Sequence, residues 1–190
     1  MNKKEIAYHE AGHLVADLYF NLKPVEATII PNKTSLGSVS HKNRLRPDYT
    51  PEEKLNAWRN RTKLKRVLIF DPYDLDEQRQ KRIGKKYILS LLAGHVAQKK
   101  YNNTTDGADN DFEIALNIIE VAFRLPKKYD IDENFDQGYA DYLWNRFMPQ
   151  TEMFVTNHWK EITHTANLLL KKKTLSYEDI DDLWQTLKQI

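Results

Sequence analysis

Tyr8-His9-Glu10-Ala11-Gly12-His13 is the stretch from which both the fold and the chemistry of this chain can be predicted. Residues four apart share one face of an α-helix, so the imidazoles of His9 and His13 can reach one point in space. Glu10 lies one step round the helix, close enough to contact a water held at that point. This pattern is typical of two zinc ligands and a general base. The two small residues that follow Glu10 leave room for another element to approach closely.

The helix that carries this stretch is expected to lie in the core. It should run from about Lys3 to Phe20 and end before Pro24. Its apolar stripe at helical spacing consists of Ile6, Ala7, Leu14, Val15 and Leu18. The two histidines fall at or near the buried edge of this stripe, where unpaired imidazoles would be costly. The alternative, a core helix that carries these residues without a metal, is therefore less favoured.

The composition limits the fold and the kind of site. A length of 190 residues fits one domain with a sizeable core, and a net charge of +2 gives no reason to expect a nucleic-acid partner. There is no cysteine, so any metal site must use histidine and carboxylate ligands. No apolar run is long enough to span a membrane, and we read no signal peptide. We therefore expect a cytoplasmic protein.

A small β-sheet should follow the first helix. Residues 25–30 are rich in β-branched side chains and are stopped by Pro31, and residues 36–41 form a second, short and polar strand. Such a polar strand suits the edge of a sheet. In zinc proteases an edge strand commonly binds the substrate peptide through its main chain. An ordinary hairpin that covers the core is an equally good interpretation.

The remaining chain is predicted to be helical apart from a basic segment at about 42–82. Within that segment Thr50 and Pro51 mark a helix start, and the charge is either a solvated face or a surface for an acidic partner. Further helices are expected at 83–101, from Asp111 to before Pro126, at 153–173, and after the capping residue Ser176, with Tyr177 on its buried face. We expect one domain over residues 1–190 that is mainly α with a small β-sheet (α+β), with a basic insertion at about 42–82.

The sequence pattern leaves the third metal ligand open. A catalytic zinc needs three protein ligands and an open position. The extended metzincin pattern would require glycine at position 16 and histidine at position 19, where this chain has Ala16 and Tyr19, so that class is excluded. The remaining candidates are His41, His95, His158, His164 and many carboxylates. His95, alone on an apolar helix, is interpreted as a hydrogen-bonded core residue, and Asp109 or Asp111 could be a helix N-cap.

Several stretches together resemble the peptidase domain of the FtsH-type ATP-dependent zinc metalloproteases. They are Tyr8-His9-Glu10-Ala11-Gly12-His13, Thr28-Ile29-Ile30-Pro31, Leu36-Gly37, Leu92-Ala93-Gly94-His95-Val96-Ala97, the segment from Asp106 to Ala115, and Leu169-Leu170-Lys171-Lys172-Lys173-Thr174-Leu175. The resemblance covers most of the chain apart from about 42–82, and it implies a zincin-like helical peptidase domain. In that family the third zinc ligand is the aspartate after Gly-Ala-x-Asn, which is Asp111 here.

The chain departs from the family at identifiable positions. The family usually has arginine where this chain has His95, and glutamate where it has Gln98. FtsH proteins carry a membrane anchor and an ATPase module ahead of the peptidase. This sequence contains no Gly-rich phosphate-binding loop. We therefore expect a peptidase domain that stands alone, without the ATPase module.

The resemblance implies a zinc-dependent endopeptidase that hydrolyses peptide bonds with a metal-activated water. Zn²⁺ would be held by His9, His13 and Asp111, and Glu10 would act as the general base. The expected substrate is a peptide or an unfolded protein. Two alternatives remain: a non-proteolytic regulatory or binding module that retains the zinc site, and a peptidase subunit that works with a separate ATPase or as a homo-oligomer.

Overall fold

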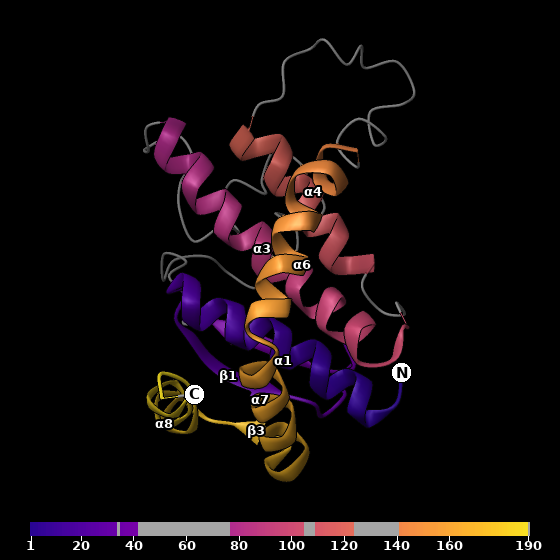
Figure 1. Cartoon of the computed structure of the whole chain (residues 1–190), viewed down its shortest axis with the longest axis vertical. Helices are drawn as coiled ribbons and strands as arrows, with labels where there is room; N and C mark the ends of the chain where they lie inside the picture. The colour runs from indigo at the N-terminus through magenta and orange to yellow at the C-terminus, as the bar shows by residue number, and fades with distance from the viewer. Residues whose placement is uncertain (34, 42–76, 105–108, 124–140, 190) are drawn as a thin grey trace.

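The computed structural model describes residues 1–33, 35–41, 77–104, 109–123 and 141–189. These residues form helices and one three-stranded antiparallel sheet, which confirms the predicted α+β class (Figure 1). The elements in chain order are α1 (Lys3–Phe20), β1 (Pro24–Thr28), β2 (Ser38–His41), α3 (Glu77–Asn102), α4 (Asp109–Phe123), the π-helical turn η2 (Leu143–Phe147), α6 (Met148–Asn157), α7 (Trp159–Lys172), β3 (Thr174–Leu175) and α8 (Tyr177–Leu187).

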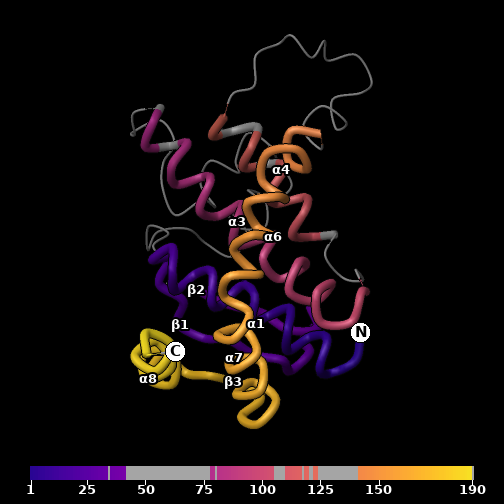
Figure 2. Tube along the Cα trace, in the orientation of Figure 1, coloured from indigo at the N-terminus to yellow at the C-terminus, as the bar shows by residue number. Residues whose placement is uncertain are grey.

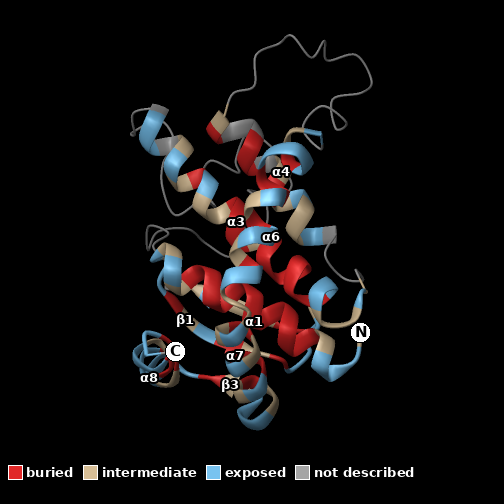
Figure 3. Ribbon diagram, viewed as in Figure 1, coloured by how far each residue is buried: buried red, intermediate tan, exposed pale blue. Residues whose placement is uncertain are grey.

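Helix α1 is the centre of the structure, and its predicted bounds are confirmed. Every residue from Ile6 to Asp17 is buried, so the helix is covered on all sides rather than along one stripe (Figure 3). Its first turn is closed by a capping box, in which the Asn2 side chain accepts from the Glu5 backbone N–H and the Glu5 carboxylate accepts from the Asn2 N–H. At its other end Asn21 adopts the left-handed conformation, with φ of 58°.

Helix α3 packs directly against α1 through small residues. A Cβ built on Gly12 would lie 2.8 Å from the carbonyl carbon of Ala93 and from the Cβ of Ala97. The close approach predicted from the sequence is thus present, and only glycine permits it at this position. Helix α3 begins at Glu77, earlier than the expected start at 83, so the end of the predicted basic insertion is helical.

The sheet has the order β2-β1-β3, so β2 lies at an edge of the described sheet, as predicted. The strands are shorter than the expected ranges 25–30 and 36–41. The Ile29 N–H still donates to the Lys173 carbonyl, but the Ile30 N–H bonds to the Thr28 hydroxyl instead of a neighbouring strand. The two-residue strand β3, which pairs with β1, was not predicted.

The C-terminal helices differ from the prediction in two places. The helix expected at 153–173 is two helices, α6 and α7, because His158 leaves helical geometry with φ of −108° and ψ of 26°. Ser176 caps α8 as predicted, with Asp179 completing the capping box. Tyr177, however, is exposed rather than buried, since the apolar face of α8 begins one turn later at Ile180.

Figures 1 and 2 show how these elements surround α1. Helix α3 rises from α1 and packs with α4 and α6, while the sheet, α7 and α8 lie at the opposite end of the molecule. None of the helices in the described ranges is long and apolar enough to cross a membrane. Residues 42–76, with the helix expected from Thr50, and the helix end at Pro126 lie outside the described residues, and the single-domain assignment stays a prediction.

The close contact between α1 and α3 gives a first prediction. Gly12→Ala should lower the free energy of unfolding by about 1–3 kcal/mol, because the added methyl group would overlap the backbone of α3. In a helix interior without such a contact, glycine to alanine stabilises the folded protein by roughly 0.5–1 kcal/mol. A loss of stability would therefore indicate the close contact between α1 and α3. Urea denaturation measures the effect. Lys99→Ala, an exposed change on α3, is the control, and a Gly12→Ala protein as stable as wild type would contradict the packing.

Candidate metal centre

Three side chains from two helices converge on one point. Helix α1 contributes His9 and His13, and α4 contributes Asp111. The two Nε2 atoms lie 2.9 Å apart, and the Asp111 Oδ2 lies 3.1 Å from the Nε2 of His9 and 3.3 Å from that of His13. The structure therefore brings together the residues that the resemblance implied as zinc ligands, from positions 102 residues apart in the case of His9 and Asp111.

The spacing of these atoms fits a tetrahedral zinc site. Ligands at the usual distances of about 2.0–2.1 Å from zinc are separated from one another by about 3.3 Å. The three observed separations, from 2.9 to 3.3 Å, are close to that value. Two imidazoles and one carboxylate also form a donor set that zinc accepts, and three protein ligands leave a fourth position open.

Both imidazoles are oriented by a hydrogen bond from their other ring nitrogen. The Nδ1 of His13 lies 2.8 Å from the backbone carbonyl oxygen of Ser90, to which it can only donate. The Nδ1 of His9 lies 3.1 Å from the Oε1 of Gln98. A proton on each Nδ1 leaves the Nε2 lone pairs facing the shared point, as is usual for metal-binding histidines. Lone pairs that converge with a carboxylate repel one another unless a cation lies between them.

The pKa shifts of His13 and Asp111 also indicate that this group of atoms favours a bound positive charge. Burial alone would lower the pKa of His13, but Asp111, Glu10 and the Ser90 carbonyl outweigh it and raise the pKa to about 10. Burial would likewise raise the pKa of Asp111, yet His13 and His9 hold it well below its usual range. The carboxylate of Asp111 is thus ionised at neutral pH, and a proton on His13 occupies the place that a metal ion would take.

Glu10, next to His9 on α1, faces Gly37, the residue before β2. Its side chain is 5% exposed, and a Cβ built on Gly37 would lie 2.6 Å from its Oε1. Glycine at position 37, just before β2, therefore makes room for the carboxylate. Burial raises the pKa of Glu10, while attraction to His13 and His9 offsets part of this increase. A raised pKa makes a carboxylate a stronger base near neutral pH.

The other sequence candidates lie elsewhere. The Nε2 of His41 is 2.8 Å from Asp17, and the Nδ1 of His158 is 3.1 Å from Glu161. Within the described ranges, only His9, His13 and Asp111 form a group of three or more residues that could hold a metal, so His164 is not part of one. Asp111 is the third residue of α4, which excludes the N-cap interpretation.

His95 is buried, as expected, but one of its two ring nitrogens has no hydrogen bond within the described part of the chain. Its ring packs edge-on against Phe112, with centroids 4.8 Å apart. Its Nδ1 has no hydrogen-bond partner among the described residues. Burial, together with repulsion from His9 and Lys99, lowers the pKa of His95, so it is neutral at pH 7.

Sequence reasoning missed the residues of α3 that support the ligands. Ser90 accepts from His13, Gly94 lets the His13 ring lie against the helix, and Gln98 contacts His9. A Cβ at Gly94 would lie 2.6 Å from the Cε1 of His13. The three positions are spaced by four along the helix, so they share one face, and this spacing was the available signal.

Comparison with known proteins shows a distant similarity to a zinc metalloprotease. The ATP-dependent zinc metalloprotease FtsH of Clostridium perfringens is 30% identical over 149 residues, which make up 77% of this chain but only 16% of that protein. The chain thus corresponds to a small part of the length of this relative. No family model matches the chain. The chain is therefore distantly similar to a zinc metalloprotease over most of its own length.

The geometry predicts the metal content of three variants. The wild-type protein should bind about one zinc per chain, and His9→Ala, His13→Ala and Asp111→Asn should each lose most of their zinc affinity, because each removes one of the three ligands. Metal analysis and a competition titration with a chromogenic chelator measure this. Glu113→Gln is the matched control, because it replaces an exposed carboxylate on the same helix as Asp111 by a neutral amide. Full zinc affinity in Asp111→Asn would exclude it as a ligand.

The raised pKa of His13 predicts proton release on metal binding. At pH 6, which is well below a pKa of about 10, His13 is protonated and must lose its proton before Nε2 can bind zinc. Zinc binding should therefore release at least one proton, and the apparent affinity should increase with pH. Calorimetric titrations in two buffers with different ionisation enthalpies measure this release. Binding without net proton release would show that His13 is not a protonated ligand.

Proposed function

We propose that this chain is a zinc-dependent endopeptidase, with His9, His13 and Asp111 as the zinc ligands and Glu10 as the general base. The observation that carries the proposal is the convergence of three metal-binding atoms within 3.3 Å of one another, beside a buried carboxylate. A structural metal would need no such carboxylate next to it. The distant similarity to a zinc metalloprotease supports the same chemistry.

Glu10 is suited to take and return a proton. A zinc ion at this position would lower the pKa of a water molecule and polarise a substrate carbonyl. Glu10, on the same helix as two ligands, would accept the proton of the attacking water and pass it to the departing amine. Gly37 leaves room for this carboxylate, because a larger residue at position 37 would overlap it.

The edge strand β2 offers a place for an extended substrate. Glu10 contacts Gly37, the residue immediately before β2, so a segment paired with β2 would run past the base. Ile30 and Leu36, at the two ends of the connection that precedes β2, expose 54% and 45% of their surface and could contact apolar substrate side chains. Pairing of this kind requires an extended backbone, which favours peptides and unfolded proteins as substrates. Delivery by a separate ATPase stays a prediction.

Cleavage of an unfolded protein tests this proposal. Wild-type protein loaded with zinc should cleave casein, and chelation should stop it. Glu10→Gln should retain zinc but lose at least about 100-fold in rate, because an amide cannot accept the proton. Glu113→Gln serves again as the control, since it removes an exposed carboxylate on another helix. Gel analysis of casein, with zinc content measured on the same samples, gives both readouts.

The outcomes separate the proposed enzyme from its main alternative. If Glu10→Gln cleaves as fast as wild type, Glu10 is not the base. If zinc-loaded wild-type protein cleaves neither casein nor short peptides, the chain is instead a binding or regulatory module that retains the zinc site.

A further inference from the structure

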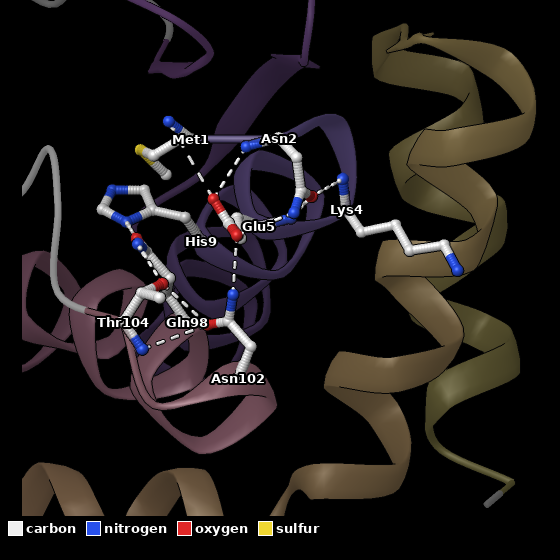
Figure 4. A network of polar contacts seen from close by, with 8 residues as sticks. All are labelled: Met1, Asn2, Lys4, Glu5, His9, Gln98, Asn102 and Thr104. Atoms are coloured by element: carbon white, nitrogen blue, oxygen red, sulfur yellow. Dashed lines mark hydrogen bonds and ion pairs between the residues drawn. The ribbon is translucent and has the colours of Figure 1, made fainter.

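A chain of hydrogen bonds joins the ligand His9 to a carboxylate at the start of the same helix. It passes from His9 to Gln98, then to Thr104, Asn102 and Glu5 (Figure 4). The heavy-atom distances along this chain are 3.1, 3.2, 2.7 and 2.7 Å. It thus connects α1 to the end of α3 and back.

Two contacts fix the orientation of the Asn102 amide. The backbone N–H of Thr104, which can only donate, points to the Asn102 Oδ1 at 3.2 Å. On the other side, the Asn102 Nδ2 lies 2.7 Å from the Glu5 carboxylate, which accepts. Oxygen toward Thr104 and nitrogen toward Glu5 is therefore the orientation that satisfies both contacts.

The orientation of Asn102 determines the next two groups. Since its Oδ1 accepts, the Thr104 hydroxyl at 2.7 Å must donate to it. That hydroxyl has one proton, so toward Gln98 it accepts, and the Gln98 Nε2 donates at 3.2 Å. The other end of the Gln98 amide, Oε1, then faces His9 as an acceptor.

The proton of His9 consequently belongs on Nδ1, and its Nε2 is bare. Every donor in the chain points the same way, from His9 toward Glu5. We propose that Gln98, Thr104, Asn102 and Glu5 form a one-way hydrogen-bond relay that holds His9 in the tautomer able to bind metal, and that the Glu5 carboxylate raises the metal affinity of His9 through this relay. This inference rests on the metal site proposed above, but the relay itself exists independently of any metal.

The burial and anchoring of the relay suit this role. Gln98 is completely buried, so reorientation of its amide is not compensated by water. Glu5 is held by Asn2, whose backbone N–H and Nδ2 each donate to the carboxylate at 2.7 Å. Metal-binding histidines commonly donate directly to a carboxylate. Here two amides and one hydroxyl separate His9 from the Glu5 carboxylate. Their hydrogen bonds all run in the same direction, so each polarises the next.

Thr104 is the position at which the relay can be interrupted with least change of shape. Valine replaces the hydroxyl by a methyl group of similar size, so the Gln98 Nε2 loses this acceptor. The Thr104 hydroxyl then no longer favours the amide orientation with Oε1 toward His9, and the opposite orientation, with Nε2 toward His9, should gain population. His9 would have to accept on Nδ1, and its proton would move to Nε2, the atom that faces Asp111 and the metal.

The experiment compares Thr104→Val with Thr104→Ser and wild type. Zinc affinity should fall by about tenfold or more in Thr104→Val and recover in Thr104→Ser, which restores the hydroxyl. In the metal-free protein, long-range ¹H–¹⁵N correlation spectra should show a protonated Nδ1 on His9 in wild type and Thr104→Ser. Thr104→Val should show protonation shifted toward Nε2. Thr186→Val is the control, because Thr186 is exposed and its hydroxyl donates to a carbonyl of its own helix.

Glu5→Gln tests the remote carboxylate. The Glu5 carboxylate accepts from three donors, and glutamine has one acceptor oxygen. With that oxygen toward the Nδ2 groups of Asn2 and Asn102, the negative charge is lost and the Asn102 orientation is kept, while the Asn2 backbone N–H loses its acceptor. Zinc affinity should fall, though by less than in Thr104→Val, because the amide orientations remain. Unchanged affinity would overturn the role of the carboxylate.

The outcomes distinguish failure of the relay from failure of the proposed enzyme. Wild-type zinc affinity and unchanged His9 nitrogen shifts in Thr104→Val would overturn the relay, and so would a Thr104→Ser protein that behaves like Thr104→Val. A wild-type protein that binds no zinc would overturn the proposed function, while the metal-free spectra would still decide whether the relay sets the His9 tautomer.

Discussion

The contact between the backbones of α1 and α3 is the constraint on which the site depends. Gly12 allows the Ala93 carbonyl to approach α1, and Gly94 allows the His13 ring to lie against α3. With the helices this close, His13 meets Ser90 and His9 meets Gln98. The order of the partners is reversed along the two helices, so α1 and α3 run in opposite directions where they cross. Two rows of residues spaced by four therefore match, one bearing ligands and the other their acceptors.

Charge in a small buried volume is the second constraint. Three acceptor atoms at 2.9–3.3 Å would repel one another without a positive charge between them, and burial prevents water from screening that repulsion. Protonation of His13, whose pKa is raised to about 10, reduces this repulsion. A divalent cation between the three atoms would reduce it further. A fold that arranges acceptors in this manner is stabilised by the ion it binds, because binding favours the native state.

Local sequence information was sufficient for the parts of the structure that depend on neighbouring residues. Helix α1, with its cap and its two histidines spaced by four, follows from side chains within one helix, and its bounds were predicted correctly. Asp111 could not be chosen by spacing and came only from the family resemblance, since its place depends on how α4 packs against α3. The contact of Gly37 with Glu10 and the helix break at His158 were missed for the same reason, because both are set by tertiary packing rather than by periodicity.

Asp17 shows how the sheet and the candidate metal centre are joined. Its carboxylate is 1% exposed and accepts from the Ser90 hydroxyl with one oxygen and from the His41 Nε2, at 2.8 Å, with the other. Ser90 uses its backbone carbonyl to orient His13, so one residue of α3 contacts both the ligand and the carboxylate. His41 is the last residue of β2, the strand proposed to bind substrate. Because a buried carboxylate without its donors would be costly, Asp17 holds the edge strand and α3 in one fixed arrangement about α1. Strand β2, proposed to bind substrate, and His13, a candidate zinc ligand, are thereby positioned by the same buried group.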